Sequence, residues 1–249
     1  METIQVELNK KKYTIVEPNI QLWSNVMKFK DLLDDEELYI KMISEVLGIT
    51  REEVLSADTT EIIEIGDYVY SFINKESKKL FKQIEFKETK YNLVDVNNIS
   101  FGQYADIDTF LRKDEGYRIA NLNELAAYLY TEDGIVYTNS NIKLRIEEFK
   151  TLPIKYVEGA IFFFVEFSKS ISRTYPSLFP EQAHVDGNED KNNFNAYWGW
   201  YSAISTLAND SVFEIDNVVA LPLYQCLNHL SYIIDKRQEQ ERLNKMQSK

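Results

Sequence analysis

Two consecutive stripes of apolar residues organise the C-terminal part of the chain. The first comprises Tyr197, Trp200, Tyr201, Ile204 and Leu207, and the second comprises Val219, Leu223, Cys226, Leu227, Leu230, Ile233 and Ile234. Both recur at three- and four-residue steps, which places the members of each on one face of a helix. The intervening residues 209–216 are short and polar at both ends. The pattern therefore predicts two neighbouring helices packed face to face, most simply as a hairpin that closes a core.

Proline at position 222 lies within the second stripe. Proline lacks a backbone N–H and kinks or breaks a helix, so we expect an interruption near the start of the second helix. Such an interruption would leave part of the first helix uncovered. We therefore predict that Trp198 or Trp200 is partly exposed in the isolated protein.

Strict alternation of apolar and polar residues predicts two small β-hairpins, near residues 4–16 and 82–95. Residues 83–86 and 90–94 match residues 5–8 and 12–16 in register, including charged and aromatic positions. The match indicates either a duplicated hairpin-plus-helix unit or a chance likeness of short alternating segments. It places a domain boundary near Lys79, with an N-terminal subdomain over residues 1–79 and a helical domain with the second hairpin over residues 80–249.

Helical periodicity covers much of the remaining chain. The predicted helices span residues 19–33, 35–47, 60–80, 121–130, 142–149 and 154–172. Gly48 is suited to a helix C-cap, Thr50 opens a capping box, and Ser100 is suited to the N-cap of a further helix through Leu111. The fold class that follows is mainly α (α+β): a helical bundle with two small β-hairpins.

The composition narrows the class of protein. An apolar content of 44% with 27% charged residues is typical of a globular protein. With 8 Gly against 16 Tyr and 14 Phe, an all-β sandwich or a dinucleotide-binding sheet is disfavoured. The net charge of −12 repels phosphate backbones, so we expect no nucleic acid partner. The longest apolar run, residues 160–165, is too short to cross a bilayer, and the N-terminus lacks the apolar region of a secretory signal.

Candidate chemical sites are few. His184, Asp186, Asn188 and Asp190 alternate, but an EF-hand would need Gly at Lys191 and Glu at Tyr197. The single cysteine, Cys226, precedes His229 by three residues, which offers a nucleophilic pair without a visible third group or oxyanion device. Neither glycine-rich phosphate-binding motif occurs. We therefore predict no catalytic residue, no metal and no cofactor, and retain the Cys–His pair as the alternative for an enzyme.

A set of segments with spaced aromatic residues and Leu-Pro steps indicates a family. They are residues 99–106 after the second hairpin, Leu152-Pro153, Trp198-Gly199-Trp200, Leu207-Ala208, Leu221-Pro222-Leu223 and residues 227–230. Together they resemble tail assembly chaperones and baseplate-hub assembly factors of tailed bacteriophages. The resemblance covers mainly residues 80–240, and residues 1–79 depart from the usual shorter form.

The resemblance implies a non-enzymatic assembly protein that binds a helical tail component through an apolar groove. Its implied partners are phage tail or baseplate proteins, with a second copy of the chain as a further candidate, and its implied location is the host cytoplasm during assembly or the virion. Candidate partner-binding residues are Phe101, Trp198, Trp200 and Tyr201. Two alternatives stay open: a structural subunit retained in the virion, such as a connector, ring or baseplate component, and an acidic adaptor or inhibitor of a host protein.

Overall fold

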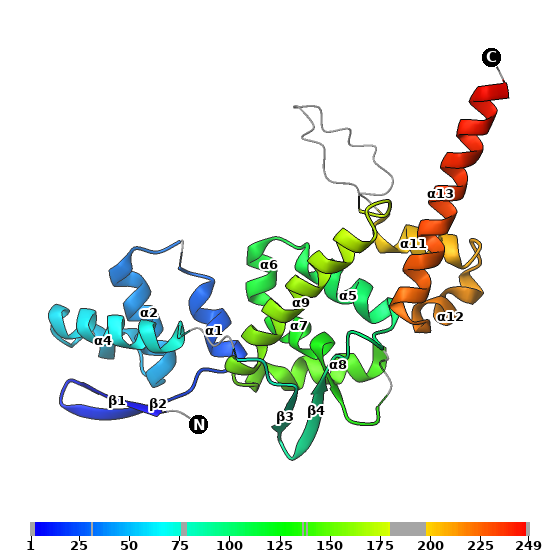
Figure 1. Cartoon of the computed structure of the whole chain (residues 1–249). Coiled ribbons are helices and arrows are strands. Elements are labelled where there is room, and N and C mark those ends of the chain that lie inside the picture. The colour runs from blue at the N-terminus through cyan, green and yellow to red at the C-terminus, as the bar shows by residue number, and fades with distance from the viewer. Residues whose placement is uncertain are drawn as a thin grey trace. The chain divides into compact units, whose positions relative to one another are not determined.

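The structure, a computed structural model, describes residues 3–30, 32–75, 79–135, 137, 139–179 and 198–247 (Figure 1). These residues form mainly helices, with one two-stranded and one three-stranded antiparallel sheet. The predicted mainly α (α+β) class with two small hairpins is confirmed. In the part of the chain so described, no helix combines the length and apolarity needed to span a membrane.

The chain divides into two compact units. Unit 1 contains Met1–Leu93 and Lys113–Phe162, and unit 2 contains Val94–Arg112 and Phe163–Lys249. The division falls within helix α9 (Lys155–Thr174). The domain boundary near Lys79 was inferred from the repeated hairpin pattern in the sequence, and it stays a prediction.

Both hairpins form where alternation predicted them. Strands β1 (Thr3–Leu8) and β2 (Lys11–Val16) pair antiparallel, and so do β3 (Gln83–Phe86) and β4 (Thr89–Leu93). Each hairpin turns through two residues with positive φ, Asn9-Lys10 in the first and Lys87-Glu88 in the second. Positive φ at both central residues is what a two-residue hairpin turn with the correct twist requires. The sequence match between the hairpins therefore extends to their turn geometry.

A third strand was not predicted. Strand β5 (Tyr130–Glu132) pairs with β4, whereas the sequence pattern had placed residue 130 at the end of a helix. The helix itself, α7 (Leu122–Leu129), is present and ends one residue earlier. A strand of three residues is too short to produce an alternation that could be recognised in sequence.

Unit 1 contains most of the short helices. They are α1 (Ile20–Met27), α2 (Asp35–Leu47), α3 (Arg51–Leu55), α4 (Thr59–Ile73), α6 (Glu115–Ala120), α7, α8 (Asn139–Glu148), the 3₁₀ helix η1 (Phe149–Thr151) and the start of α9. The cap predictions are confirmed: Gly48 ends α2 with φ +66°, and Thr50 forms a capping box with Glu53. Helix α6 was not predicted.

Two helices are shorter than their apolar patterns. Residues 19–33 and 60–80 were predicted as helices, but α1 ends at Met27 and α4 at Ile73. Beyond α1 the pattern continues through Leu32, which is 75% exposed. Periodicity alone does not extend a helix when no neighbouring surface is present to bury its apolar face.

One hydrophobic cluster joins the first hairpin to α1, α2, α3 and α4. Its buried members are Val6, Leu8, Ile15, Val26, Met27, Ile40, Met42, Ile43, Val54, Ile62, Ile65, Val69 and Ile73. The hairpin turn is also fixed by polar contacts, since Asn9 donates its backbone N–H to Glu61 and its side-chain amide to Ser56. The apolar residues of the N-terminal alternation therefore form the inner face of the hairpin, which packs on these helices.

Unit 2 contains α5 (Phe101–Leu111), the second part of α9, α11 (Trp200–Leu207), the 3₁₀ helix η2 (Val212–Glu214), α12 (Ile215–Ala220) and α13 (Leu223–Gln247). Ser100 caps α5 as predicted, by accepting a hydrogen bond from the N–H of Gln103. The second apolar stripe is divided between α12 and α13 at Pro222, so the predicted interruption is confirmed.

The break at Pro222 is stabilised by a bridge to the start of α5. The N–H of Phe101 donates to the carbonyl of Leu221 (2.8 Å), and the N–H of Leu223 donates to the carbonyl of Ile99 (3.0 Å). Ser100 and Pro222 are thus paired in an isolated antiparallel bridge. Two segments of the phage resemblance, far apart in sequence, meet at this point.

Unit 1 contains the same kind of bridge. Asn19 pairs with Pro153, through hydrogen bonds from Ile20 to Leu152 (2.9 Å) and from Ile154 to Pro18 (3.0 Å). In both units the N-cap residue of the helix after a hairpin pairs with the proline that begins another helix. The shared arrangement favours the duplicated hairpin-plus-helix interpretation over a chance likeness.

Candidate functional site

Helix α11 is attached to unit 2 through Trp200. The indole ring contacts Phe101, Tyr104 and Phe179 edge-on, with ring centroids 5.6, 5.4 and 5.9 Å away. Edge-to-face pairs at these distances favour a fixed ring orientation. Trp200 therefore docks α11 onto the surface of α5.

A buried carboxylate completes this attachment. Asp108 is 6% exposed and accepts hydrogen bonds from the Trp200 indole N–H (2.8 Å) and from Arg112 Nε (2.6 Å). The hydrogen bond to Asp108 raises the pKa of the Arg112 guanidinium above its ordinary value. A buried charge needs such partners to remain in the protein interior. Asp108 thus fixes the orientation of Trp200 in addition to its ring contacts.

Two other aromatic residues at the start of α11 face solvent. Trp198 is 44% exposed and Tyr201 is 49% exposed, and their rings lie 5.5 Å apart. The prediction that Trp198 or Trp200 is partly exposed is confirmed. Helix α11 has no buried residue along its length, so it lies on unit 2 without being covered.

The four partner-binding candidates therefore lie at different depths. Phe101 is 0% exposed and packs beneath the half-buried Trp200, whereas Trp198 and Tyr201 lie on the outside. Phe101 contacts Trp200, and the Trp198–Tyr201 pair flanks Trp200 along the chain, so all four lie in one part of unit 2. Only the outer pair offers substantial surface to another molecule.

The most exposed apolar residues of this region were not predicted. Val212 and Phe213 in η2 are 68% and 89% exposed. The preceding turn has positive φ at Asn209 and Asp210, and the Asp210 carboxylate accepts a hydrogen bond from Ser205 Oγ (2.9 Å). The turn thereby presents Val212 and Phe213 next to the C-terminal end of α11. An apolar pair inside an otherwise polar linker was the available sequence signal, and it was interpreted only as a connection between helices.

We define the α11 surface as Trp198, Tyr201, Val212 and Phe213. Its own segment, residues 198–235, contains no Lys or Arg and exposes Asp210, Glu214 and Asp216. A basic residue near it is Arg112, which shares Asp108 with Trp200. All four residues of the surface are exposed and fall within residues 198–213, and exposed apolar groups of this kind are candidates for interaction sites. The α11 surface therefore combines aromatic anchors with negative charge.

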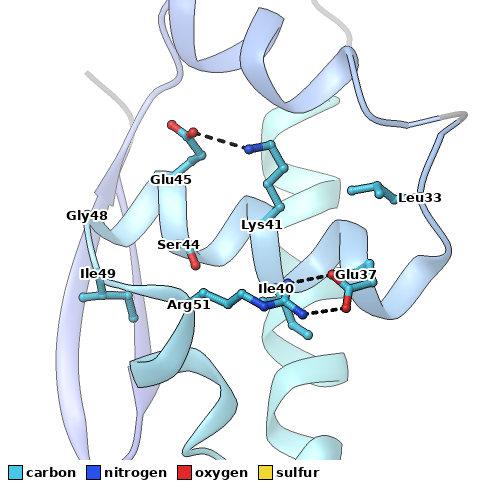
Figure 2. Close-up of a pocket in the computed structure, with 9 residues that line it drawn as sticks. All are labelled: Leu33, Glu37, Ile40, Lys41, Ser44, Glu45, Gly48, Ile49 and Arg51. Carbon is cyan, nitrogen blue, oxygen red and sulfur yellow. Dashed lines mark hydrogen bonds and ion pairs between the residues drawn. The ribbon is translucent and has the colours of Figure 1, made fainter.

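Unit 1 has an open pocket of about 460 Å³ beside α2 (Figure 2). Its lining comprises Leu33, Glu37, Ile40, Lys41, Ser44, Glu45, Gly48, Ile49 and Arg51. The charged residues pair with one another: Arg51 with Glu37 at 2.6 Å and Lys41 with Glu45 at 3.8 Å. Hydrogen bonding to Arg51 lowers the pKa of Glu37, as expected for a paired surface carboxylate. The charged groups of this pocket therefore already pair with one another.

The Cys–His alternative for an enzyme finds little support in the geometry. Cys226 is 2% exposed, and burial raises the pKa of its thiol to about 11. A nucleophilic cysteine requires the thiolate, which such a pKa disfavours at neutral pH. His229 lies on the exposed side of α13 and stacks on Tyr232 with centroids 6.2 Å apart. The two residues thus point into different environments.

Within the described ranges, no group of three or more His, Cys, Asp or Glu side chains is placed to hold a metal ion. The acidic segment with His184, Asp186, Asn188 and Asp190 lies outside the described residues. Comparison with known proteins gave no match to a family model, a curated protein or a solved structure.

Proposed function

We propose that this chain is a non-enzymatic assembly protein of a tailed bacteriophage that binds a helical tail or baseplate component. The observation that carries the proposal is the α11 surface, where four exposed apolar side chains belong to a chain segment, residues 198–235, without Lys or Arg. Tryptophan, tyrosine and phenylalanine are the residues that most often anchor protein interfaces. The phage assignment itself rests on the sequence resemblance.

The α11 surface suits a helical partner in its dimensions. Trp198 and Tyr201 lie at the N-terminal end of α11, and Val212 and Phe213 follow its C-terminal end. A helix of this length spans roughly 12 Å, close to the roughly 10.5 Å between residues seven apart on a partner helix. An amphipathic helix laid along α11 would therefore contact both apolar pairs, Trp198–Tyr201 and Val212–Phe213, with one apolar face.

The charge of the surface adds selectivity. Asp210, Glu214 and Asp216 border the apolar side chains, so a partner helix with Lys or Arg beside its apolar stripe is favoured and an acidic one is repelled. The net charge of −12 keeps such a complex soluble while an apolar partner is covered. Both properties are those expected of a chaperone-like binding protein.

Affinity capture from infected cells tests the proposal. Tagged full-length protein should retain a tail or baseplate protein, and the variant with Tyr201→Ser and Phe213→Ser should lose at least 90% of it. Leu144→Ser, which changes another apolar residue that is 77% exposed, is the matched control and should retain the partner. Equal capture by all three proteins would contradict the role of the α11 surface.

Purified particles distinguish the versions of this function. A transient chaperone is absent from mature virions, whereas a connector, ring or baseplate subunit is present at fixed copy number. Quantitative mass spectrometry of virions measures this directly. Capture of a host protein in place of any phage protein, lost on the same double substitution, would instead favour the adaptor or inhibitor alternative.

A further inference from the structure

The C-terminal half of α13 has an unusual position for a helix. After Asp235, residues 236–247 stay helical, and every one of them is exposed. Figure 1 shows this part of α13 extending beyond the other helices of unit 2. A helical segment of this length is marginal alone in water, and most helices gain their stability from packing. We define residues 236–247 as the α13 tail.

The α13 tail has a net positive charge, whereas residues 198–235 have only acidic charged residues. It contains four basic residues, Lys236, Arg237, Arg242 and Lys245, and two acidic residues, Glu239 and Glu241. Leu243 and Met246 are 44% and 63% exposed, and their three-residue separation places them on one face of the helix. Lys236 and Arg242 flank that same face by helical spacing. Arg242 is paired with Glu239 at 2.7 Å in the monomer, an exposed pair that a partner carboxylate has to replace. The tail is thus a basic amphipathic helix, the class of ligand that the α11 surface fits.

The tail does not reach the α11 surface of its own chain. Helix α13 begins at Leu223, directly after α12, and continues without a break to Gln247. At 1.5 Å per residue the tail starts roughly 20 Å along the axis from that beginning and extends away from it. Only the tail of another molecule can lie on the α11 surface without melting α13.

We propose that two copies of this chain form a reciprocal dimer in which the α13 tail of each docks on the α11 surface of the other. Leu243 and Met246 cover Phe213 and Val212, while Lys236 and Arg242 approach Glu214 and Asp216. A twofold arrangement forms the contact twice, which raises the buried area toward the roughly 1,200 Å² of the smaller specific interfaces. The dimer shields the apolar residues until another helix displaces the tail. This inference does not depend on the phage assignment.

Sedimentation velocity of the full-length protein from about 1 to 200 µM tests the dimer. The expected result is a monomer–dimer equilibrium with a dissociation constant in the tens of micromolar, weakened several-fold by raising NaCl from 50 to 500 mM because exposed charge pairs are screened. Phe213→Ser and termination after Asp235 should each leave a monomer at 200 µM. Leu144→Ser should dimerise like the unchanged chain, and circular dichroism confirms that each variant is folded.

A charge exchange tests the pairing itself. The variant Glu214→Lys/Asp216→Lys and the variant Lys236→Glu/Arg242→Glu should each be monomeric. Mixed in equal amounts they should dimerise again, since both contacts in the mixed dimer join opposite charges. A wild-type chain that stays monomeric at 200 µM overturns the proposal, as does a dimer that survives removal of the tail or a mixture that fails to associate. A monomer that still captures a tail protein through Phe213 would refute the dimer and leave the proposed function standing.

Discussion

Among single residues, one buried polar side chain does most to position the α11 surface. That residue is Asp108, because its carboxylate joins Trp200 of α11 to Arg112 of α5. With many acidic residues in the chain, nothing in the sequence separates Asp108 from the solvent-exposed majority. The cap residues Thr50 and Ser100 were predictable because a cap needs only its own neighbours.

We predict that Asp108→Asn weakens the attachment of α11. The amide keeps the shape but loses the charge, and its NH₂ group opposes the donors of Trp200 and Arg112, so the loss should be about 1–3 kcal/mol of unfolding free energy. Urea unfolding followed by tryptophan fluorescence measures it. The control is Glu166→Gln, which disrupts the exposed pair with Lys169 and should cost under about 0.5 kcal/mol. Equal effects of the two substitutions would contradict the role given to Asp108.

We also predict that Cys226 is unreactive in the folded protein. Burial raises its pKa to about 11 from an ordinary value of 9.0, so at pH 8 the folded thiol is almost wholly protonated. Alkylation by iodoacetamide, measured by mass spectrometry, should be at least about 100-fold slower than in urea-unfolded protein. The stability of the folded protein should fall as the pH rises from 9 toward 11, because the unfolded thiol ionises first. Well below pH 9 this thiol has no pH-dependent effect on the free energy of unfolding. Rapid alkylation at neutral pH would revive the nucleophile hypothesis.

At the scale of elements, local sequence predicted helix starts and stops well where caps are strong. Helix α2 matches its predicted residues because Asp34 and Gly48 cap its ends. Helices α1 and α4 end at Met27 and Ile73, before their apolar patterns do. Periodicity therefore predicted that these helices exist, but not where they end.

Gly66 of α4 illustrates how a neighbouring element reverses a local rule. An alanine in the middle of a helix is ordinarily more stable than glycine by about 1 kcal/mol. Here a Cβ at position 66 would overlap the ring of Tyr39 from α2, and the Tyr39 hydroxyl is bonded to Asp67, an interaction that raises the pKa of Tyr39 to about 12. The ring is therefore held in place over the glycine. Glycine at this position permits α2 and α4 to pack closely.

We predict that Gly66→Ala destabilises the protein by about 1–3 kcal/mol, as overpacking does in other cores. Thermal and urea unfolding measure the change. In a background carrying Tyr39→Ala, the same substitution should be neutral or stabilising by up to about 1 kcal/mol, because the overlap is gone and helix propensity remains. A cost that persists without the Tyr39 ring would place its cause elsewhere.

At the scale of the whole molecule, two bridges organise the fold. Asn19 with Pro153 and Ser100 with Pro222 each join a helix that follows a hairpin to a Leu-Pro step that begins another helix. The hairpin likeness was visible in sequence, but its extension to the bridges was not, since each bridge joins segments more than a hundred residues apart. The two matching bridges favour duplication of a hairpin, helix and bridge over a chance likeness.

We predict that termination after Asp235 leaves the fold of each unit intact. The removed residues 236–247 are exposed, so the midpoint of thermal unfolding at low protein concentration should change by less than about 2 °C. At high concentration the full-length protein should unfold at a higher temperature than the truncated one, because association stabilises the folded state. Calorimetry at 5 and 200 µM makes the comparison. A large loss at 5 µM would assign the α13 tail a role inside the monomer.

The fold class, both hairpins, most helix positions, the principal caps and the break at Pro222 could be predicted from the amino-acid pattern. Each of these depends on interactions between residues within about one turn or one hairpin of each other. Three features could not: Phe101 lies beneath Trp200, Asp108 holds both Trp200 and Arg112, and Val212 and Phe213 stay exposed. Burial depends on what packs against a side chain, and the partners here come from segments distant in sequence. The complete exposure of the α13 tail likewise appears only in the structure.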